Sequence, residues 1–76
     1  MPKEIILPDG KKTTNDSQEY MRYCEAITIL KWKRPKAQRF LQAIRDRQHI
    51  ERADSILRYI RLILQKRQKN GLHNSP

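Results

Sequence analysis

The chain has 76 residues, enough for one domain with a thin core in which roughly 60% of the unfolded chain's surface is buried. Its 17 lysines and arginines against 8 acidic residues give a net charge of +9, which favours an anionic partner such as nucleic acid or an acidic protein surface. One cysteine and no long apolar run argue against an internal disulfide, a signal peptide and a membrane span, so we expect a cytoplasmic protein.

Residues 1–14 predict a short N-terminal β-hairpin or an ordered arm. The apolar run Ile5-Ile6-Leu7 enters Pro8-Asp9-Gly10, where proline presets the first turn position and glycine accepts a positive φ. Two strands alone are not stable in water, so Ile5 or Leu7 must pack on the chain's own helices or on a partner. Packing on its own helices is the favoured alternative.

A first helix is predicted over residues 16–32, beginning with a capping box in which Asp16 accepts a backbone N–H and Glu19 reaches back. One face of this helix carries Tyr20, Tyr23, Cys24, Ile27 and Leu30. A second apolar stripe carries Met21, Ile29 and Trp32. Either the second stripe receives the hairpin, which is the favoured interpretation, or Trp32 is an anchor for a partner.

A second helix is predicted over residues 35–47, because Pro35 disfavours helical geometry at the preceding residue and suits a first turn. Its buried stripe should be Ala37, Phe40, Leu41 and Ile44. The segment Arg47-Gln48-His49 follows without glycine or proline, and we expect a turn there.

A third helix is predicted over residues 50–69, ending at Asn70-Gly71, with residues 71–76 forming a disordered tail. Its spacing predicts a core face made of Ala53, Ile56, Leu57, Ile60, Ile63 and Leu64. The expected fold is therefore mainly α: a three-helix single domain over residues 1–70 with a short N-terminal β-hairpin or arm.

The residues offer no catalytic set. Cys24 lies on the predicted buried stripe, while His49 falls in a connection and His73 in the tail, so no nucleophile has a neighbouring base. One cysteine and two separated histidines do not make a metal site, and no glycine-rich phosphate loop occurs. We expect a protein that is not an enzyme and holds no cofactor or metal.

Basic residues form two candidate binding surfaces. The residues proposed to contact a partner or nucleic acid are Lys31, Trp32, Lys33, Arg34, Lys36, Arg39, Arg58, Leu62 and Lys66. Lysine and arginine on exposed faces suit phosphate contacts, which give affinity without sequence information. If Trp32 and Leu62 shared one surface, the resulting apolar patch with a basic rim would suit a protein partner better.

Sequence-specific DNA reading by a helix-turn-helix is a weaker alternative. The second helix would be the recognition helix, but it uses its apolar stripe for the core. It would offer mainly Gln38, Arg39, Gln42 and Arg45 to base edges.

Leu7-Pro8-Asp9-Gly10, Asp16-Ser17, Cys24-Glu25-Ala26, Pro35 and Arg39 form a pattern that resembles small phage and prophage proteins of largely unassigned function. The resemblance covers roughly residues 5–64. An arginine after Cys-Glu-Ala and a glycine between the last two helices belong to that pattern, whereas this chain has Ile27 and Gln48-His49 there. In size and charge the chain is also similar to small Xanthomonas phage regulators that bind host RNA polymerase.

The resemblance implies a phage-type regulator in the cytoplasm of a bacterial host. Such a protein would bind a host protein complex, RNA polymerase above all, and act as an inhibitor or antiterminator. The alternative from another class is a direct, weakly specific DNA- or RNA-binding module. Inhibition of a bacterial defence system is a third hypothesis, although a mimic of nucleic acid would be acidic. The residues leave the oligomeric state open.

Overall fold

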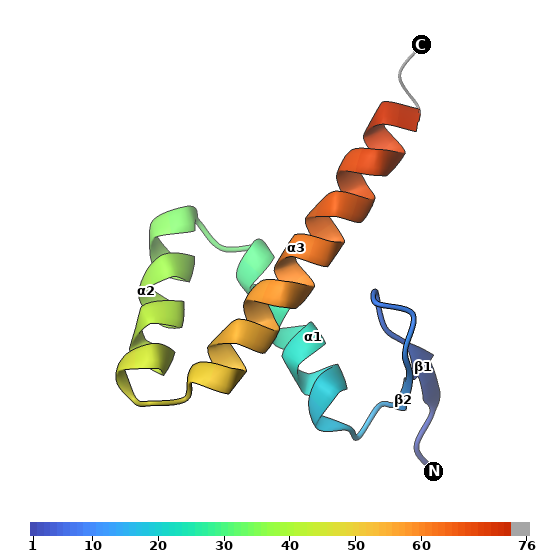
Figure 1. Cartoon of the computed structure of the whole chain (residues 1–76), viewed down its shortest axis with the longest axis horizontal. Helices are drawn as coiled ribbons and strands as arrows, with labels where there is room; N and C mark the ends of the chain where they lie inside the picture. The colour runs from blue at the N-terminus through green and yellow to red at the C-terminus, as the bar shows by residue number, and fades with distance from the viewer. Residues whose placement is uncertain (74–76) are drawn as a thin grey trace.

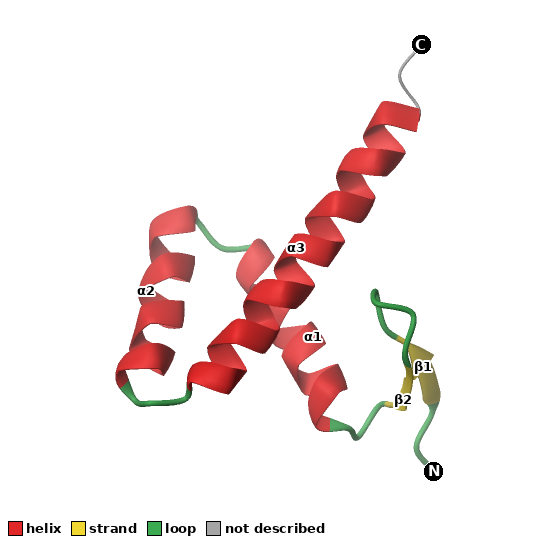
Figure 2. Cartoon of the chain, in the orientation of Figure 1, coloured by secondary structure: helices red, strands yellow, loops and turns green. Residues whose placement is uncertain are grey.

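The structure, a computed structural model, describes the backbone of residues 1–73 and the side chains of residues 1–68. Two short strands, β1 (Glu4–Ile6) and β2 (Lys12–Thr14), precede three helices: α1 (Gln18–Leu30), α2 (Arg34–Asp46) and α3 (Ile50–His73). In Figures 1 and 2, α3 runs diagonally between α2 on one side and the hairpin on the other. The predicted mainly α fold with three helices and an N-terminal hairpin is confirmed.

The hairpin has the turn chemistry that its sequence predicts. The two strands pair antiparallel, with Ile5 opposite Thr13. The Gly10 N–H donates to the Leu7 carbonyl (2.9 Å) and the Leu7 N–H donates to the Lys11 carbonyl (2.9 Å). Gly10 has a φ of +87°, as expected for a three-residue loop that ends in a bulge. Leu7 is 2% exposed, so the hairpin packs on the chain's own helices through this residue.

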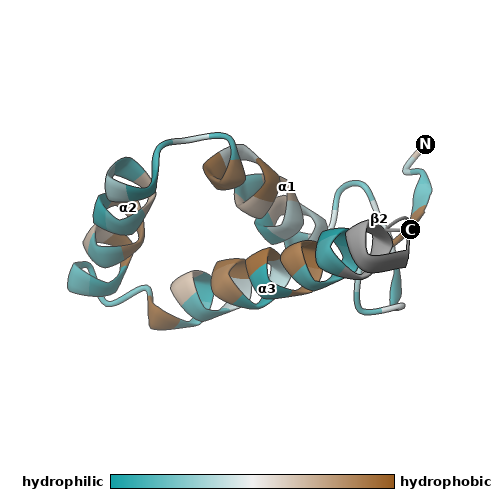
Figure 3. Ribbon diagram, turned by 90° about the horizontal axis from the view of Figure 1, so that it is seen from above, coloured by the Kyte–Doolittle hydropathy of each residue, from teal (hydrophilic) through white to brown (hydrophobic). Residues whose placement is uncertain are grey.

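The core lies where α3 crosses α1 and α2. Its fully buried members are Leu7, Ala26, Ile29, Ile44, Ala53, Ile56 and Tyr59. The α2 stripe is as predicted, since Ile44 is buried and Ala37, Phe40 and Leu41 pack against the core. Figure 3 shows apolar positions of the helices turned towards one another. On α3 two predictions fail, because Leu64 is 46% exposed and Tyr59, which was not expected in the core, is 1% exposed.

Helix α1 packs partly through the predicted face, since Tyr20 and Tyr23 pack against the core, and partly beyond it. Ala26 and Ile29 are its buried residues, whereas Met21 is 54% exposed. Cys24, predicted on the buried stripe, is only partly buried. Ile29 therefore belongs to the core between helices, and the stripe of Met21, Ile29 and Trp32 does not receive the hairpin.

The first helix begins one residue later than expected. Ser17 is the N-cap, and its hydroxyl accepts a hydrogen bond from the Tyr20 N–H at 3.1 Å. Asp16, the predicted cap, instead accepts a hydrogen bond from the Thr14 hydroxyl. Both residue types cap helices well, so the pattern alone does not choose between them.

Helix α3 continues to His73, beyond its predicted end at Asn70-Gly71. Residues 74–76, predicted as part of a disordered tail, lie outside the described residues. The radius of gyration is 13.9 Å, against about 11 Å for a compact chain of this length. The C-terminal half of α3 projects past α1 and α2, which accounts for the larger value (Figure 1).

The expected turn between α2 and α3 is sharp. The His49 N–H donates to the Ile44 carbonyl (3.0 Å) and the Gln48 N–H donates to the Arg45 carbonyl (2.9 Å). This is a Schellman motif, in which the residue after the helix cap adopts a left-handed conformation that glycine usually occupies. Here that residue is Gln48, with a φ of +67°.

Replacing Gln48 with glycine should therefore stabilise the fold. A residue with a side chain in the left-handed region destabilises the folded state by roughly 1–2 kcal/mol. Glycine removes this strain, but its greater conformational freedom stabilises the unfolded chain and offsets part of the gain. We expect Gln48→Gly to raise the free energy of unfolding by about 1 kcal/mol in urea denaturation. Gln48→Ala is the control, because it removes the exposed side chain but keeps the strain. Equal stability of the two variants would contradict the account.

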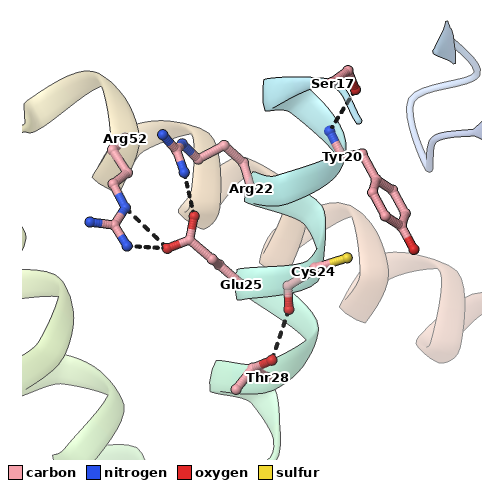
Figure 4. Close-up of polar contacts among 7 residues, drawn as sticks. All are labelled: Ser17, Tyr20, Arg22, Cys24, Glu25, Thr28 and Arg52. Atoms are coloured by element: carbon pink, nitrogen blue, oxygen red, sulfur yellow. Dashed lines mark hydrogen bonds and ion pairs between the residues drawn. The ribbon is translucent and has the colours of Figure 1, made fainter. Parts of the chain in front are cut away.

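An ion-pair network holds the three helices together (Figure 4). Arg22 donates to Glu25 Oε1 (2.5 Å), and Arg52 from α3 donates to Glu25 Oε2 through both Nε (3.0 Å) and Nη2. The Arg52 guanidinium also lies 6.0 Å from the ring centroid of Phe40 on α2. Partial burial raises the pKa of the Glu25 carboxyl, but the hydrogen bonds from Arg52 and Arg22 outweigh it and lower this pKa.

This network should make stability depend on pH. Because the pKa of Glu25 is lower in the folded chain than in the unfolded one, its contribution is present near neutral pH. That contribution is lost as the pH falls through the folded-state pKa. We expect Glu25→Gln to cost about 1 kcal/mol at pH 7, with the difference from the parent vanishing in acid. Glu51→Gln, at an exposed position, is the control for thermal melts across pH.

Candidate nucleic-acid interface

Five basic residues gather where α1 ends and α2 begins. Each has an exposed side chain, and we call them the turn cluster: Lys31, Lys33, Arg34, Lys36 and Arg39. Among residues 1–68, no member lies within ion-pair distance of a carboxylate, whereas Arg22, Arg45, Arg52 and Arg58 each do. The cluster's charge therefore faces solvent without an internal counterion.

The turn cluster surrounds the positive end of the α2 dipole. Lys33 is the N-cap, its side chain makes no capping bond, and the first turn of α2 carries no acidic residue. The first N–H groups of a helix have no partner within the helix, and they attract anions. Backbone and side chains thus present positive potential at one place on the surface.

The half-buried Trp32 packs between this turn and α2. Its ring packs edge-to-face on Phe40, with centroids 5.3 Å apart and planes at 86°. The Lys36 Nζ lies 4.4 Å from the Trp32 ring centroid, and Trp32 also packs against the core. The role of Trp32 as a partner contact stays a prediction: the ring is half-buried, and its described contacts are with Phe40, Lys36 and the core.

The hairpin lies against the second predicted surface, which consists of Arg58, Leu62 and Lys66 on α3. Arg58 donates to Asp9 Oδ2 of the hairpin turn (3.3 Å), and its guanidinium lies 4.9 Å from the Tyr59 ring centroid. Leu62, predicted to be exposed, packs partly buried against the core. Lys66 lines a hollow beside the hairpin. Trp32 and Leu62 are thus both half-buried against the core, and the apolar patch proposed from them stays a prediction.

Helix α2 is poorly equipped to read bases. Arg45 is only partly exposed and pairs with Asp54 at 2.6 Å, and Gln42 donates to Asp46 at 3.0 Å. Of the four side chains offered to base edges, only Gln38 and Arg39 are exposed without such a partner. Two base-contacting side chains are fewer than the roughly three or four that a typical recognition helix uses.

Cys24 and His49 lie on different elements of the described chain. Cys24 is partly buried on α1, where its carbonyl accepts a hydrogen bond from the Thr28 hydroxyl at 3.0 Å (Figure 4). His49 lies in the α2–α3 turn. Within the part of the chain that the structure describes, no three histidine, cysteine or acidic side chains gather to hold a metal ion. The His73 side chain lies outside that part.

Sequence reasoning missed two features. The network of Arg22, Glu25 and Arg52 joins residues 27 positions apart, and no local pattern marks it. The hollow beside Lys66 also brings together distant segments, although Leu7-Pro8-Asp9 had indicated a hairpin that must pack somewhere.

No protein-family model, curated protein or solved structure matches the chain, so its function rests on its own residues. The resemblance to phage and prophage proteins stays a prediction. Within residues 1–73, no helix has the length and apolar content needed to cross a lipid bilayer.

Proposed function

We propose that this chain is a small non-enzymatic module that binds the phosphate backbone of nucleic acid through the turn cluster. The observation that carries the proposal is the gathering of five exposed basic residues at the open N-terminus of α2, none of which pairs with a carboxylate within residues 1–68. Phosphate oxygens are the natural partners of such a surface, since lysine and arginine side chains and helix N-termini are common donors to the backbone.

The same geometry favours weak sequence preference. The turn cluster carries charge but few groups suited to base edges, and the exposed face of α2 adds only Gln38 and Arg39. Binding of this kind depends on the release of counterions and therefore falls steeply as salt rises. If all five basic side chains contacted a phosphate, the affinity for nucleic acid would fall roughly 500-fold between about 50 and 200 mM salt.

Fluorescence anisotropy with two labelled DNA duplexes of unrelated sequence, each at these two salt concentrations, tests the proposal. We expect similar affinities for the two duplexes at low salt and a large loss for both at high salt. A labelled single-stranded RNA of the same length distinguishes a preference for RNA. Absence of binding to all three probes at low salt would overturn the proposal.

The second candidate is a phage-type regulator that acts on the host transcription machinery, with RNA polymerase as the expected partner. The observation that favours it is a hollow beside the hairpin that carries apolar side chains next to Lys66 and Arg67 of α3, a surface suited to a protein. Pull-down with purified bacterial RNA polymerase tests this candidate, and no retention of the enzyme would count against it. The two candidates are compatible, because they use different surfaces.

A further inference from the structure

The hairpin, α1 and the projecting half of α3 enclose a groove of ≈ 500 Å³. Its walls come from three elements: Ile6 of β1, Tyr23 and Ile27 of α1, and Ile63, Lys66 and Arg67 of α3. Figure 1 shows why it exists, since α3 continues past the other helices while the hairpin stands beside it. The groove lies across α3 from α2, apart from the turn cluster.

This groove leaves apolar side chains in contact with solvent. Ile6 is 67% exposed, Ile63 is only partly buried, and the neighbouring Leu64 is 46% exposed. In a domain with such a thin core, leaving three large aliphatic residues in contact with water forgoes a substantial part of the available hydrophobic stabilisation. Exposed apolar surface with a polar rim marks an interaction site.

Charge decides which partner fits. The charged residues that line the groove, Lys66 and Arg67, are both basic. Among residues 1–68, neither lies within ion-pair distance of a carboxylate; the nearby Asp9 pairs with Arg58 and Glu4 with Lys12. A second copy of this chain would bring another +9 charge to the same basic rim, so self-association is disfavoured. An acidic partner is attracted instead.

The groove's size indicates how much of that partner it takes. A cavity of about 150 Å³ holds one benzene ring, so this groove has room for roughly three side chains of that size. Three anchors at positions i, i+3 or i+4, and i+7 are the usual apolar set of an amphipathic helix lying in a groove.

We propose that this groove binds an acidic amphipathic helix of another protein, with two or three large apolar anchors between Ile6 and Ile63 and carboxylates beside Lys66 and Arg67. The inference is independent of nucleic-acid binding, because no residue is shared between the groove and the turn cluster.

A labelled synthetic peptide with leucine at i, i+4 and i+7 and glutamate at its flanking positions is the probe. We expect saturable binding by fluorescence anisotropy, with chemical-shift changes in the NMR spectrum confined to the groove. Ile6→Asp should weaken binding at least about tenfold, because it places a like charge among the anchors. Ile6 is exposed, so the fold should survive, and the unchanged spectrum of the remaining core checks this.

Two further experiments separate the contribution of charge from that of the apolar anchors. Lys66→Glu with Arg67→Glu should weaken the peptide about tenfold and leave DNA affinity nearly unchanged, whereas reversing Lys33, Arg34 and Lys36 should do the opposite. A peptide with alanine at the three anchors should not bind. Three results would each overturn the proposal: no saturable binding to the parent, equal binding to Ile6→Asp, or shifts outside the groove. So would concentration-dependent self-association through these residues, or a preference for anionic vesicles.

Discussion

Ile56→Ala is expected to lower the free energy of unfolding by about 2–5 kcal/mol, because it removes buried methylenes and leaves a cavity. Ile56 is 0% exposed and belongs to the core where α3 crosses the other helices. A chain of 76 residues typically has a stability of about 4–11 kcal/mol, so the substitution should remove roughly half of it. Circular dichroism during urea denaturation measures the change.

Ile60→Ala provides the internal comparison. Ile60 is one turn further along α3 and packs against the core from a partly buried position. Its truncation should cost clearly less, since part of the side chain is already in contact with water and solvent can fill the space. A larger loss at Ile60 than at Ile56 would show that the core lies further along α3 than described here.

Reversing Lys33, Arg34 and Lys36 to glutamate should lower DNA affinity at least about tenfold while leaving the fold intact. Lys36→Glu loses the cation–π contact with Trp32, which is worth about 0.5–1 kcal/mol. Acidic residues in the first turn of α2 gain a similar amount from the helix dipole. Melting temperature should therefore change little, and anisotropy with labelled DNA should report the lost binding.

A matched control removes the effect of net charge alone. Lys3, Lys11 and Arg61 are exposed, lie on the hairpin arm and α3, and make no ion pair within residues 1–68. Reversing these three gives the same net charge as reversing the turn residues. If the control loses as much DNA affinity, attraction is spread over the whole molecule and the α1–α2 turn has no special role.

Much of the fold is predictable because local chemistry decides it. Pro8-Asp9-Gly10 specifies the bulged hairpin turn, and Pro35 specifies where α2 begins. Where two residue types serve equally, as with Asp16 and Ser17 at the start of α1, the pattern gives the element but not its exact end.

Burial along α3 was harder to predict, because helical periodicity identifies a face but not what covers it. Tyr59 is buried and Leu62 is half-buried near the hairpin, whereas Leu64 is exposed where α3 passes beyond its neighbours. The hairpin's position against α3 depends on contacts such as Asp9 with Arg58, 49 residues apart. Contacts of that range leave no trace in local spacing.

The candidate site was predicted in part. The residues beside Pro35 are lysines and arginines with no apolar residue among them, so the sequence predicts that they are exposed. These residues form the turn cluster in the structure. The packing of Trp32 on Phe40 was not predicted, because Phe40 lies on the next helix. The groove at Ile6 and Ile63 could not be predicted from the sequence, because it forms only when the hairpin packs beside α3.

The most direct test of the turn cluster is the slope of log affinity for duplex DNA against log salt concentration, measured for the parent and for the variant reversed at Lys33, Arg34 and Lys36. Five phosphate contacts predict a slope of about −4.5 for the parent. The two basic residues that remain in the cluster, Lys31 and Arg39, predict a slope of about −1.8 for the variant. Equal slopes for the two proteins would contradict binding through the α1–α2 turn.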